Sequence, residues 1–316
     1  MIYKKRGKPN DLLGLTALKN RIHSNHKCVR EIADKFNRAK AGYEGEINFD
    51  KHLKEFMPKY PHAILHDVYL NQGGVYFQMD SILITPATII IFEVKNIAGK
   101  LIFMGNPDRF VRELDNGERK PMESPIAQLD RKEYFLKEWL SKRGIQAPIQ
   151  GIVVLAFENE IELLSTPKKH ITFAFQVPNY LYSLPLDKGE LSGTQIKSLA
   201  TEMKRRHSDY NPFPIIKNWD VSPVDLKQGV QCQSCKFFGM QWSKQKWNCP
   251  KCKSHSVDSH IATTKDWFYL VDSKITNGEF RNFALIENQQ VAKRLLKRSG
   301  LQLHGKLRTS YYVMKN

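Results

Sequence analysis

The sequence of 316 residues has no long apolar run of the kind that a membrane-spanning helix needs. Its longest apolar stretch, Ile82 to Phe92, is interrupted by Thr85, Pro86 and Thr88. The basic N-terminus is not followed by an apolar segment, so we expect neither a secretory signal nor a membrane anchor. We therefore expect a soluble, cytoplasmic protein.

Cysteine is scarce, and its positions argue against a disulfide framework. Four of the five cysteines form two Cys-x-x-Cys pairs, Cys232 with Cys235 and Cys249 with Cys252, and Cys28 stands alone. Thirteen residues separate the pairs, a spacing typical of two knuckles that close a tetrahedral zinc site. The segment resembles a zinc ribbon, and we expect structural Zn²⁺ because four thiolates leave no open coordination position. Disulfides or a redox pair are the alternative.

Acidic residues are also few, at 32 Asp and Glu against 49 Lys and Arg, which gives a net charge of +17. A surplus of this size attracts polyanions at ordinary salt. We expect nucleic acid as the partner. Charge alone does not separate DNA from RNA, and we favour DNA. The alternative is solubility charge scattered over the surface, and a homo-oligomer or a protein partner also stays open.

The spacing of apolar residues predicts an α/β core, with no internal repeat or low-complexity tract. Expected helices cover residues 10–57, 124–143 and 194–207, and expected strands cover 66–70, 74–84, 88–94, 100–104 and 151–157. The segment 106–121 is charged and irregular. The Pro-containing segment that begins at Asn211 is predicted to be a linker.

The most specific local pattern is two apolar strands joined across the turn at Pro86. The position numbers of cross-strand partners then sum to 173, so Asp80 should face Glu93 and Gln78 should face Lys95. Facing carboxylates repel unless a cation lies between them, and hard oxygen ligands suit Mg²⁺ or Mn²⁺. Lys95 would share their face and could activate a water or offset charge on a scissile phosphate. This pattern indicates phosphodiester hydrolysis.

The alternative is a surface hairpin on which Asp80 pairs with Lys95. The continuous apolar run Ile89 to Phe92 favours a buried strand instead. Burial of Glu93 at the end of that strand is costly unless something binds the carboxylate.

Four sequence blocks then occur in order, namely Ala41-Gly-Tyr-Glu-Gly-Glu46, Gln78-Met-Asp80, Ile91-Phe-Glu93-Val-Lys95-Asn96 followed by Gly99, and Ser124-Pro-Ile-Ala-Gln128. Over residues of about 38 to 157 they resemble the nuclease-related domain (NERD) group of the PD-(D/E)xK nuclease superfamily. The resemblance implies a restriction-endonuclease-like core, a mixed sheet flanked by helices.

The resemblance also implies roles for five residues. Asp80 and Glu93 would bind the metal, Lys95 would be the catalytic lysine, Glu46 the helix-borne acid and Gln128 a further active-site residue. We expect Glu46 at a helix start, just past Gly45, where a carboxylate is favoured by the helix dipole alone. Gln128 has the alternative of a solvated helix position.

The C-terminal segment resembles a winged-helix unit. Its expected elements are a strand at 267–271, helices at 277–283 and 288–299, and strands at 303–304 and 310–313. Basic residues on the second helix and the wing would contact phosphates, namely Lys293, Arg294, Lys297, Lys306 and Arg308. The alternative is that these charges form a solvated face.

The predicted organisation is a helical N-terminal extension (1–37), a NERD-like nuclease domain (38–210), a linker (211–228), a zinc ribbon (229–260) and a winged-helix-like domain (263–316). The predicted function is a nuclease that hydrolyses DNA, or RNA, through Mg²⁺-activated water. One rival is a non-catalytic nucleic-acid-binding or regulatory protein that uses the nuclease fold as a scaffold. A second rival is a partner-activated subunit of a phage-defence or mobile-element system.

Overall fold

The computed structural model describes residues 1–315, without the side chain of Arg308. Its contacts define two compact units, which are described separately. The first unit comprises Met1–Lys8 and Lys40–Tyr210, and the second comprises Pro9–Ala39 and the residues from Asn211 onward. The segment predicted as one helical extension is thus divided between the units. None of the described helices is both long and apolar enough to cross a membrane.

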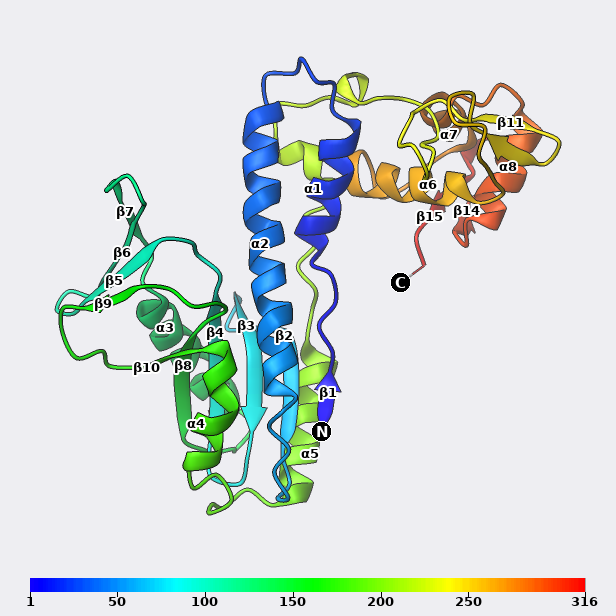
Figure 1. Cartoon of the computed structure of the whole chain (residues 1–316). Helices are drawn as coiled ribbons and strands as arrows, with labels where there is room; N and C mark the ends of the chain where they lie inside the picture. Colours follow the sequence, from blue (N-terminus) through cyan, green and yellow to red (C-terminus); the bar gives the residue numbers. More distant parts are fainter. Residues whose placement is uncertain (316) are drawn as a thin grey trace. The chain divides into compact units, whose positions relative to one another are not determined.

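A mixed six-stranded sheet forms the centre of the first unit (Figure 1). Its strands, in spatial order, are β1 (Ile2–Lys4), β2 (Ala63–Gln72), β3 (Val75–Ile84), β4 (Ile89–Lys95), β8 (Ile149–Leu155) and β10 (His170–Phe173). Strand β3 is antiparallel to both β2 and β4, whereas β4, β8 and β10 run parallel. The mixed sheet flanked by helices confirms the predicted α/β fold class, and only β1 and β10 of its strands were not predicted.

Helices cover both faces of this sheet because its central strands are apolar on both sides. In β4, Ile89 and Ile91 pack with α3 (Pro125–Ser141) and α5 (Gly193–Arg206). Ile90 and Phe92 face the opposite way and pack with α2 (Val29–Leu53) and α4 (Val177–Ser183). Side chains alternate along β4, so its odd-numbered residues, which include Glu93 and Lys95, lie on the face that α3 covers.

A second sheet of four strands belongs to the same unit. Its order is β7 (Arg119–Met122), β6 (Arg109–Glu113), β5 (Lys100–Met104) and β9 (Ile161–Leu163). The prediction that residues 106–121 are irregular is wrong, because β6 and part of β7 lie within them. Only Phe110 and Val111 of β6 are buried, and the charges around this short apolar pair masked the strand in the sequence.

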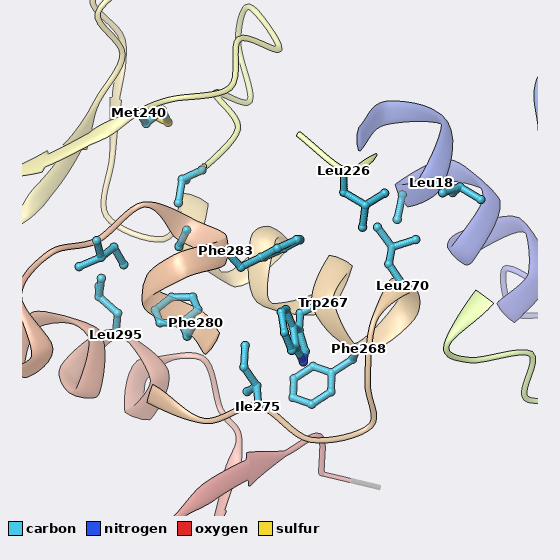
Figure 2. Close-up of a cluster of buried hydrophobic side chains, with 14 of the residues drawn as sticks. Leu18, Leu226, Met240, Trp267, Phe268, Leu270, Ile275, Phe280, Phe283 and Leu295 are labelled. Atoms are coloured by element: carbon cyan, nitrogen blue, oxygen red, sulfur yellow. The ribbon is translucent and has the colours of Figure 1, made fainter. Parts of the chain in front are cut away.

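The second unit is built around a helical core (Figure 2). Its main helices are α1 (Asn10–Arg21), α6 (Ser259–Leu270), α7 (Asn277–Ala284) and α8 (Gln289–Arg298). Leu18 of α1 lies close to Leu226 and Leu270, and Trp267 lies beside Phe268 and Ile275. The segment predicted as a linker contributes the buried residues Ile215, Ile216 and Leu226 to this core.

The strand predicted at Trp267–Val271 is wrong, because residues 267–270 form the C-terminal end of α6 and Val271 is its C-cap. The buried positions of this helix include His260, Thr263 and Thr264 as well as Trp267. Polar residues on the buried face hid the helical period, and the aromatic run that follows has a high β-propensity. The predicted helices that correspond to α7 and α8, and the strands β14 (Gln302–His304) and β15 (Tyr311–Val313), are present.

Candidate active site and metal centre

The candidate active site lies where β3 and β4 separate. Their ladder joins four pairs, from Ile84 with Ile89 to Ser81 with Phe92, and follows the predicted register. The ladder ends before Asp80 and Glu93. The Asp80 carboxylate instead accepts a hydrogen bond from the backbone N–H of Val94 at 2.8 Å. The Asp80 side chain therefore contacts the β4 backbone just beyond the last pair of the β3–β4 ladder.

The predicted pairing of Gln78 with Lys95 is wrong. Gln78 pairs with Tyr69 of β2 and donates a side-chain hydrogen bond to the Asp67 carboxylate at 2.7 Å. Asp67 has a φ of 53°, and the alternation of both strands shifts by one residue at this level. Met79 and Ile82 consequently face the same core although they lie three positions apart. The sequence pattern contains no sign of this shift.

Lys132 on α3 holds the Asp80 and Glu93 carboxylates together. Its ammonium donates to Glu93 Oε2 and lies 3.7 Å from Asp80 Oδ1. The two acids are only 8% and 3% exposed. Burial lowers the pKa of Lys132, but the charges of Asp80 and Glu93 outweigh that effect and raise it, so the ammonium stays charged. Sequence reasoning missed this residue, although it lies one helical turn beyond Gln128.

Lys95 is fixed by two acceptors in the same place. Its ammonium donates to Glu93 Oε1 at 2.7 Å and to Gln128 Oε1 at 2.6 Å. Gln128 lies in the first turn of α3, where the Ser124 side chain caps the helix by accepting from Ile126 N–H. The alternative of a surface pair between Asp80 and Lys95 is not found, since Lys95 binds Glu93. The structure thus brings together four of the five predicted catalytic residues.

These residues open onto a cleft of about 550 Å³. Strand β3 lines one side of the cleft and α3 lines the other. The lining residues are Val75, Tyr76, Phe77, Gln78, Asp80, Glu93, Lys95, Gln128, Arg131, Lys132 and Phe135. The buried carboxylates are therefore reachable by a ligand that enters between β3 and α3.

The predicted helix start at Gly45 is wrong, because α2 runs without interruption from Val29 to Leu53. A Cβ at Gly45 would lie 2.5 Å from the Cβ of Asn96, which directly follows β4. The glycine is therefore needed for the close approach of α2 to the end of β4. This approach places Glu46 in the middle of a helix and near the strand that carries Glu93.

Glu46 does not join the pair of carboxylates directly, because Arg6 binds it at 2.7 Å. Arg6 also binds Asp50 and donates to the backbone carbonyl of Asp80 at 2.8 Å and to Ser81 Oγ at 3.0 Å. Burial and then the charge of Asp80 raise the pKa of Glu46 to about 8, although Arg6 acts in the opposite direction. The pKa of Glu46 therefore depends on the charge of Asp80.

Arg6 is the second residue that sequence reasoning missed. Its side chain is 2% exposed, and three carboxylates raise its pKa despite the opposing effect of burial. Nothing distinguished it from the other basic residues of the N-terminus, because its partners lie 40 to 75 positions away. The pairing of β1 with β2 brings this segment to the site.

The carboxylate oxygens of Asp80 and Glu93 are of the kind that binds a divalent cation. Asp80 and Glu93 present two hard carboxylate oxygens to one point, which Lys132 contacts. Among the described residues, no group of three or more acidic, His or Cys ligand atoms converges except the cysteines. Mg²⁺ is commonly held by one or two carboxylates, with substrate phosphates and water completing its shell. The Asp80 and Glu93 pair fits such an ion.

The four cysteines form the second cluster. Their Sγ atoms all lie within 4.8 Å of one another, and two of the separations are 3.7 Å and 3.6 Å. Zn–S bonds of about 2.3 Å in a tetrahedron place sulfur atoms about 3.8 Å apart. The residue after each pair, Lys236 or Lys253, has a positive φ and donates its N–H back to the first cysteine's carbonyl. This four-cysteine cluster is consistent with a zinc-binding module.

A small antiparallel sheet supports the cysteine cluster, formed by β11 (Gln241–Ser243), β12 (Lys246–Asn248) and β13 (His255–Ser256). Trp247 of β12 is almost fully buried and packs edge-on against Trp242. These tryptophans therefore contribute to the core of the module.

The predicted phosphate contacts of the C-terminal segment lie on an amphipathic helix. In α8, Ala292, Leu295 and Leu296 are buried, whereas Lys293, Arg294 and Lys297 are exposed, as is Lys306 further on. The Arg308 side chain lies outside the described residues. The exposed charges suit either a solvated face or contact with phosphates, so the phosphate contacts stay a prediction.

Comparison with known proteins adds one finding. Residues 41–156 match the family model of the nuclease-related domain. No curated protein and no solved structure matches the chain. The matched segment begins in α2 before Glu46 and includes Asp80, Glu93, Lys95 and Gln128. The chain therefore carries a nuclease-related (NERD) domain over residues 41–156.

Proposed function

We propose that the chain is a metal-dependent nuclease that hydrolyses phosphodiester bonds in DNA, with RNA as a further substrate class. The observation that carries this proposal is the convergence of Asp80, Glu93, Lys95 and Gln128 on one cleft within the nuclease-related domain. Buried carboxylates with lysines beside them suit a reaction in which negative charge develops on a phosphate.

Asp80 and Glu93 would hold Mg²⁺ or Mn²⁺. Bound there, the ion would act as a Lewis acid on the scissile phosphate and favour ionisation of the attacking water. Each carboxylate is held in place by a further contact, Asp80 by Val94 N–H and Glu93 by Lys95. Preorganisation of this kind keeps the carboxylate oxygens aimed at one position.

Lys95 would orient the attacking water and offset charge on the phosphate. Two of its three N–H donors are used by Glu93 and Gln128, which leaves one for water or a phosphate oxygen. Gln128 positions the lysine, since its carbonyl oxygen accepts while its amide group donates to Glu123 at 2.6 Å. Glu46 would act behind the site by positioning Arg6, which donates to the backbone carbonyl of Asp80.

The two C-terminal modules would serve nucleic-acid binding. Zn²⁺ on the four cysteines would be structural, because the protein fills its shell completely. Lys293, Arg294, Lys297, Lys306 and Arg308 would contact phosphates. Such contacts weaken steeply with salt and give affinity without sequence information.

The experiment is a cleavage assay with purified protein on linear, circular and single-stranded DNA and on RNA, with Mg²⁺, Mn²⁺ or EDTA. We expect cleavage that requires the divalent ion and falls by about 100-fold or more in Glu93→Ala and Lys95→Ala, because each removes several kcal/mol of charge stabilisation. Cleavage that persists in both variants would overturn the assigned site. Binding without cleavage under every condition would favour a non-catalytic nucleic-acid-binding protein.

A further inference from the structure

The two carboxylates of the candidate active site each use one oxygen within the protein. Asp80 Oδ2 accepts from the backbone N–H of Val94 at 2.8 Å, and Glu93 Oε1 accepts from Lys95 at 2.7 Å. Each carboxylate therefore has one further oxygen to offer a cation, Asp80 Oδ1 and Glu93 Oε2. The Lys132 ammonium contacts both of these oxygens and lies 3.7 Å from the first. It lies at the point where the two carboxylates share one positive charge.

A metal ion bound by Asp80 and Glu93 would need the same two oxygens that the Lys132 ammonium contacts. The ammonium and the ion are both cations, and the Lys132 side chain is only 12% exposed. Like charges repel strongly at such short range where little water screens them. Lys132 therefore cannot keep its present contacts when an ion is bound, and its ammonium must move.

The lining of the cleft determines where the ammonium can move. Lys132 itself lines the cleft, together with two other cationic residues, Lys95 and Arg131. Among the described residues of the lining, the acidic ones are Asp80 and Glu93. With a divalent ion on these two carboxylates, the lining would carry a surplus of positive charge. Such a surplus attracts an anion into the cleft.

Among the described residues of α3, no second carboxylate lies one turn from Lys132. The residues at those positions are Gln128, Leu129, Phe135 and Leu136. The acidic residues closest to Lys132 in the sequence, Asp130 and Glu133, both pair with Lys169. A displaced ammonium therefore fits an anion that enters the cleft from outside.

We propose that Lys132 is a further catalytic lysine that exchanges with the divalent ion. Without the ion it holds Asp80 and Glu93 together, and with the ion bound it binds a phosphate oxygen of the substrate in the cleft. Hydrogen bonds between an ammonium and a phosphate oxygen are charge-assisted and therefore strong. This inference rests on the proposed function and identifies Lys132 as a phosphate contact of the same site.

The first test follows Lys132 in the wild-type full chain with zinc bound. The protein is acetylated briefly with a water-soluble N-hydroxysuccinimide ester, with and without saturating Mn²⁺, and each lysine is quantified by mass spectrometry. Lys132 should be protected without Mn²⁺ and acetylated several-fold faster with it, because the carboxylates no longer hold its nitrogen. Lys137, an exposed lysine of α3 that does not line the cleft, should react equally in both samples. Bound Mn²⁺ with unchanged acetylation of Lys132 would overturn the exchange.

The second test compares Lys132→Met with Lys137→Met. Mn²⁺ titrations followed by electron paramagnetic resonance should show binding at least about five-fold tighter in Lys132→Met, because the ion no longer displaces hydrogen bonds to charged groups. Cleavage at saturating Mn²⁺ should nevertheless be slower in this variant, since the phosphate contact is lost. Lys137→Met should match the wild type in both measurements. A purely structural lysine would weaken metal binding and cleavage together, so weaker or unchanged Mn²⁺ binding in Lys132→Met would overturn the inference.

The inference and the proposed function fail in different ways. Exchange of Lys132 on Mn²⁺ binding, with no cleavage of any nucleic acid, removes the nuclease proposal and leaves the exchange. Metal-dependent cleavage with weaker Mn²⁺ binding in Lys132→Met removes the exchange and leaves the nuclease. Tighter Mn²⁺ binding with undiminished cleavage in Lys132→Met would overturn the phosphate contact.

Discussion

The structure contains two clusters of side chains suited to bind a metal ion, and they differ in how completely protein atoms would surround that ion. The four cysteines supply all four ligands of a tetrahedral site. Asp80 and Glu93 would supply only two, and lysines occupy the space beside them. A closed thiolate cluster can stabilise a fold but leaves no position for a substrate. The open carboxylate pair does leave such a position, as metal-assisted hydrolysis requires.

The largest expected effect concerns the closed cluster. Cys232→Ser should reduce bound zinc from one equivalent to near zero and unfold the cysteine module, since structural zinc contributes about 10 kcal/mol or more of apparent binding free energy. Elemental analysis and circular dichroism measure the two changes. Cys28→Ser is the matched control, because this cysteine lies outside the cluster, and it should keep its zinc. A folded Cys232→Ser protein with a full equivalent of zinc would remove the four-thiolate site.

The stability of the site should fall when the Lys132 ammonium beside Asp80 and Glu93 is removed. Lys132→Met leaves the Asp80 and Glu93 carboxylates buried without that ammonium, and in EDTA we expect a loss of about 3–5 kcal/mol in the free energy of unfolding. Saturating Mg²⁺ or Mn²⁺ should recover part of the loss, about 2.7 kcal/mol at 100 times Kd. Denaturant titrations with and without metal provide the comparison.

A matched control for this prediction lies on the same helix. Lys137→Met removes an exposed lysine of α3 and should change stability by less than about 0.5 kcal/mol. If Lys132→Met were as stable in EDTA as Lys137→Met, the carboxylates would not depend on a neighbouring cation.

The two clusters also differ in how far the sequence predicts them. The cysteine ligands lie within 21 positions of one another, so their spacing alone identified the site. The register of β3 and β4 was also predictable, because both strands are apolar and adjacent in the chain. The shift of alternation at Asp67 was not, and neither were Arg6 and Lys132. Their partners lie on other elements, which only the folded sheet brings together.

The glycines of α2 illustrate the same limit. A helix was expected to start just past Gly45, yet this glycine lies inside α2 and has a close neighbour, whereas no residue lies within 4 Å of a Cβ at Gly42 of the same helix. Gly45→Ala should destabilise the protein by about 1–3 kcal/mol through overpacking against Asn96. Gly42→Ala should stabilise it by up to about 1 kcal/mol through helix propensity. Equal effects in thermal denaturation would contradict this account of the α2 contact.

The remaining expected effect is a change in the pH dependence of stability. The pKa of Glu46 is raised from 4.5 to about 8 in the folded protein, so its favourable contribution is complete below about pH 4.5 and is lost as pH rises through about 8. In EDTA, Glu46→Gln should therefore gain stability relative to the wild type between pH 5 and about pH 8. Melting temperatures across this range measure the difference.

Glu44→Gln provides the matched control for the pH series, because Glu44 is exposed on the same helix and pairs only with Lys40 among the described ion pairs. Its curve should run parallel to that of the wild type. A Glu46→Gln curve that is also parallel would show that Glu46 is not linked to the Asp80 charge.

The central claim is that Asp80 and Glu93 hold one catalytic divalent ion, and Mn²⁺ binding followed by electron paramagnetic resonance tests it most directly. The account predicts one Mn²⁺ per chain in the zinc-loaded wild type, and loss of that ion together with cleavage in Asp80→Asn and Glu93→Gln. Zinc content should stay at one equivalent in both variants. Undiminished Mn²⁺ binding and cleavage in both variants would contradict the claim.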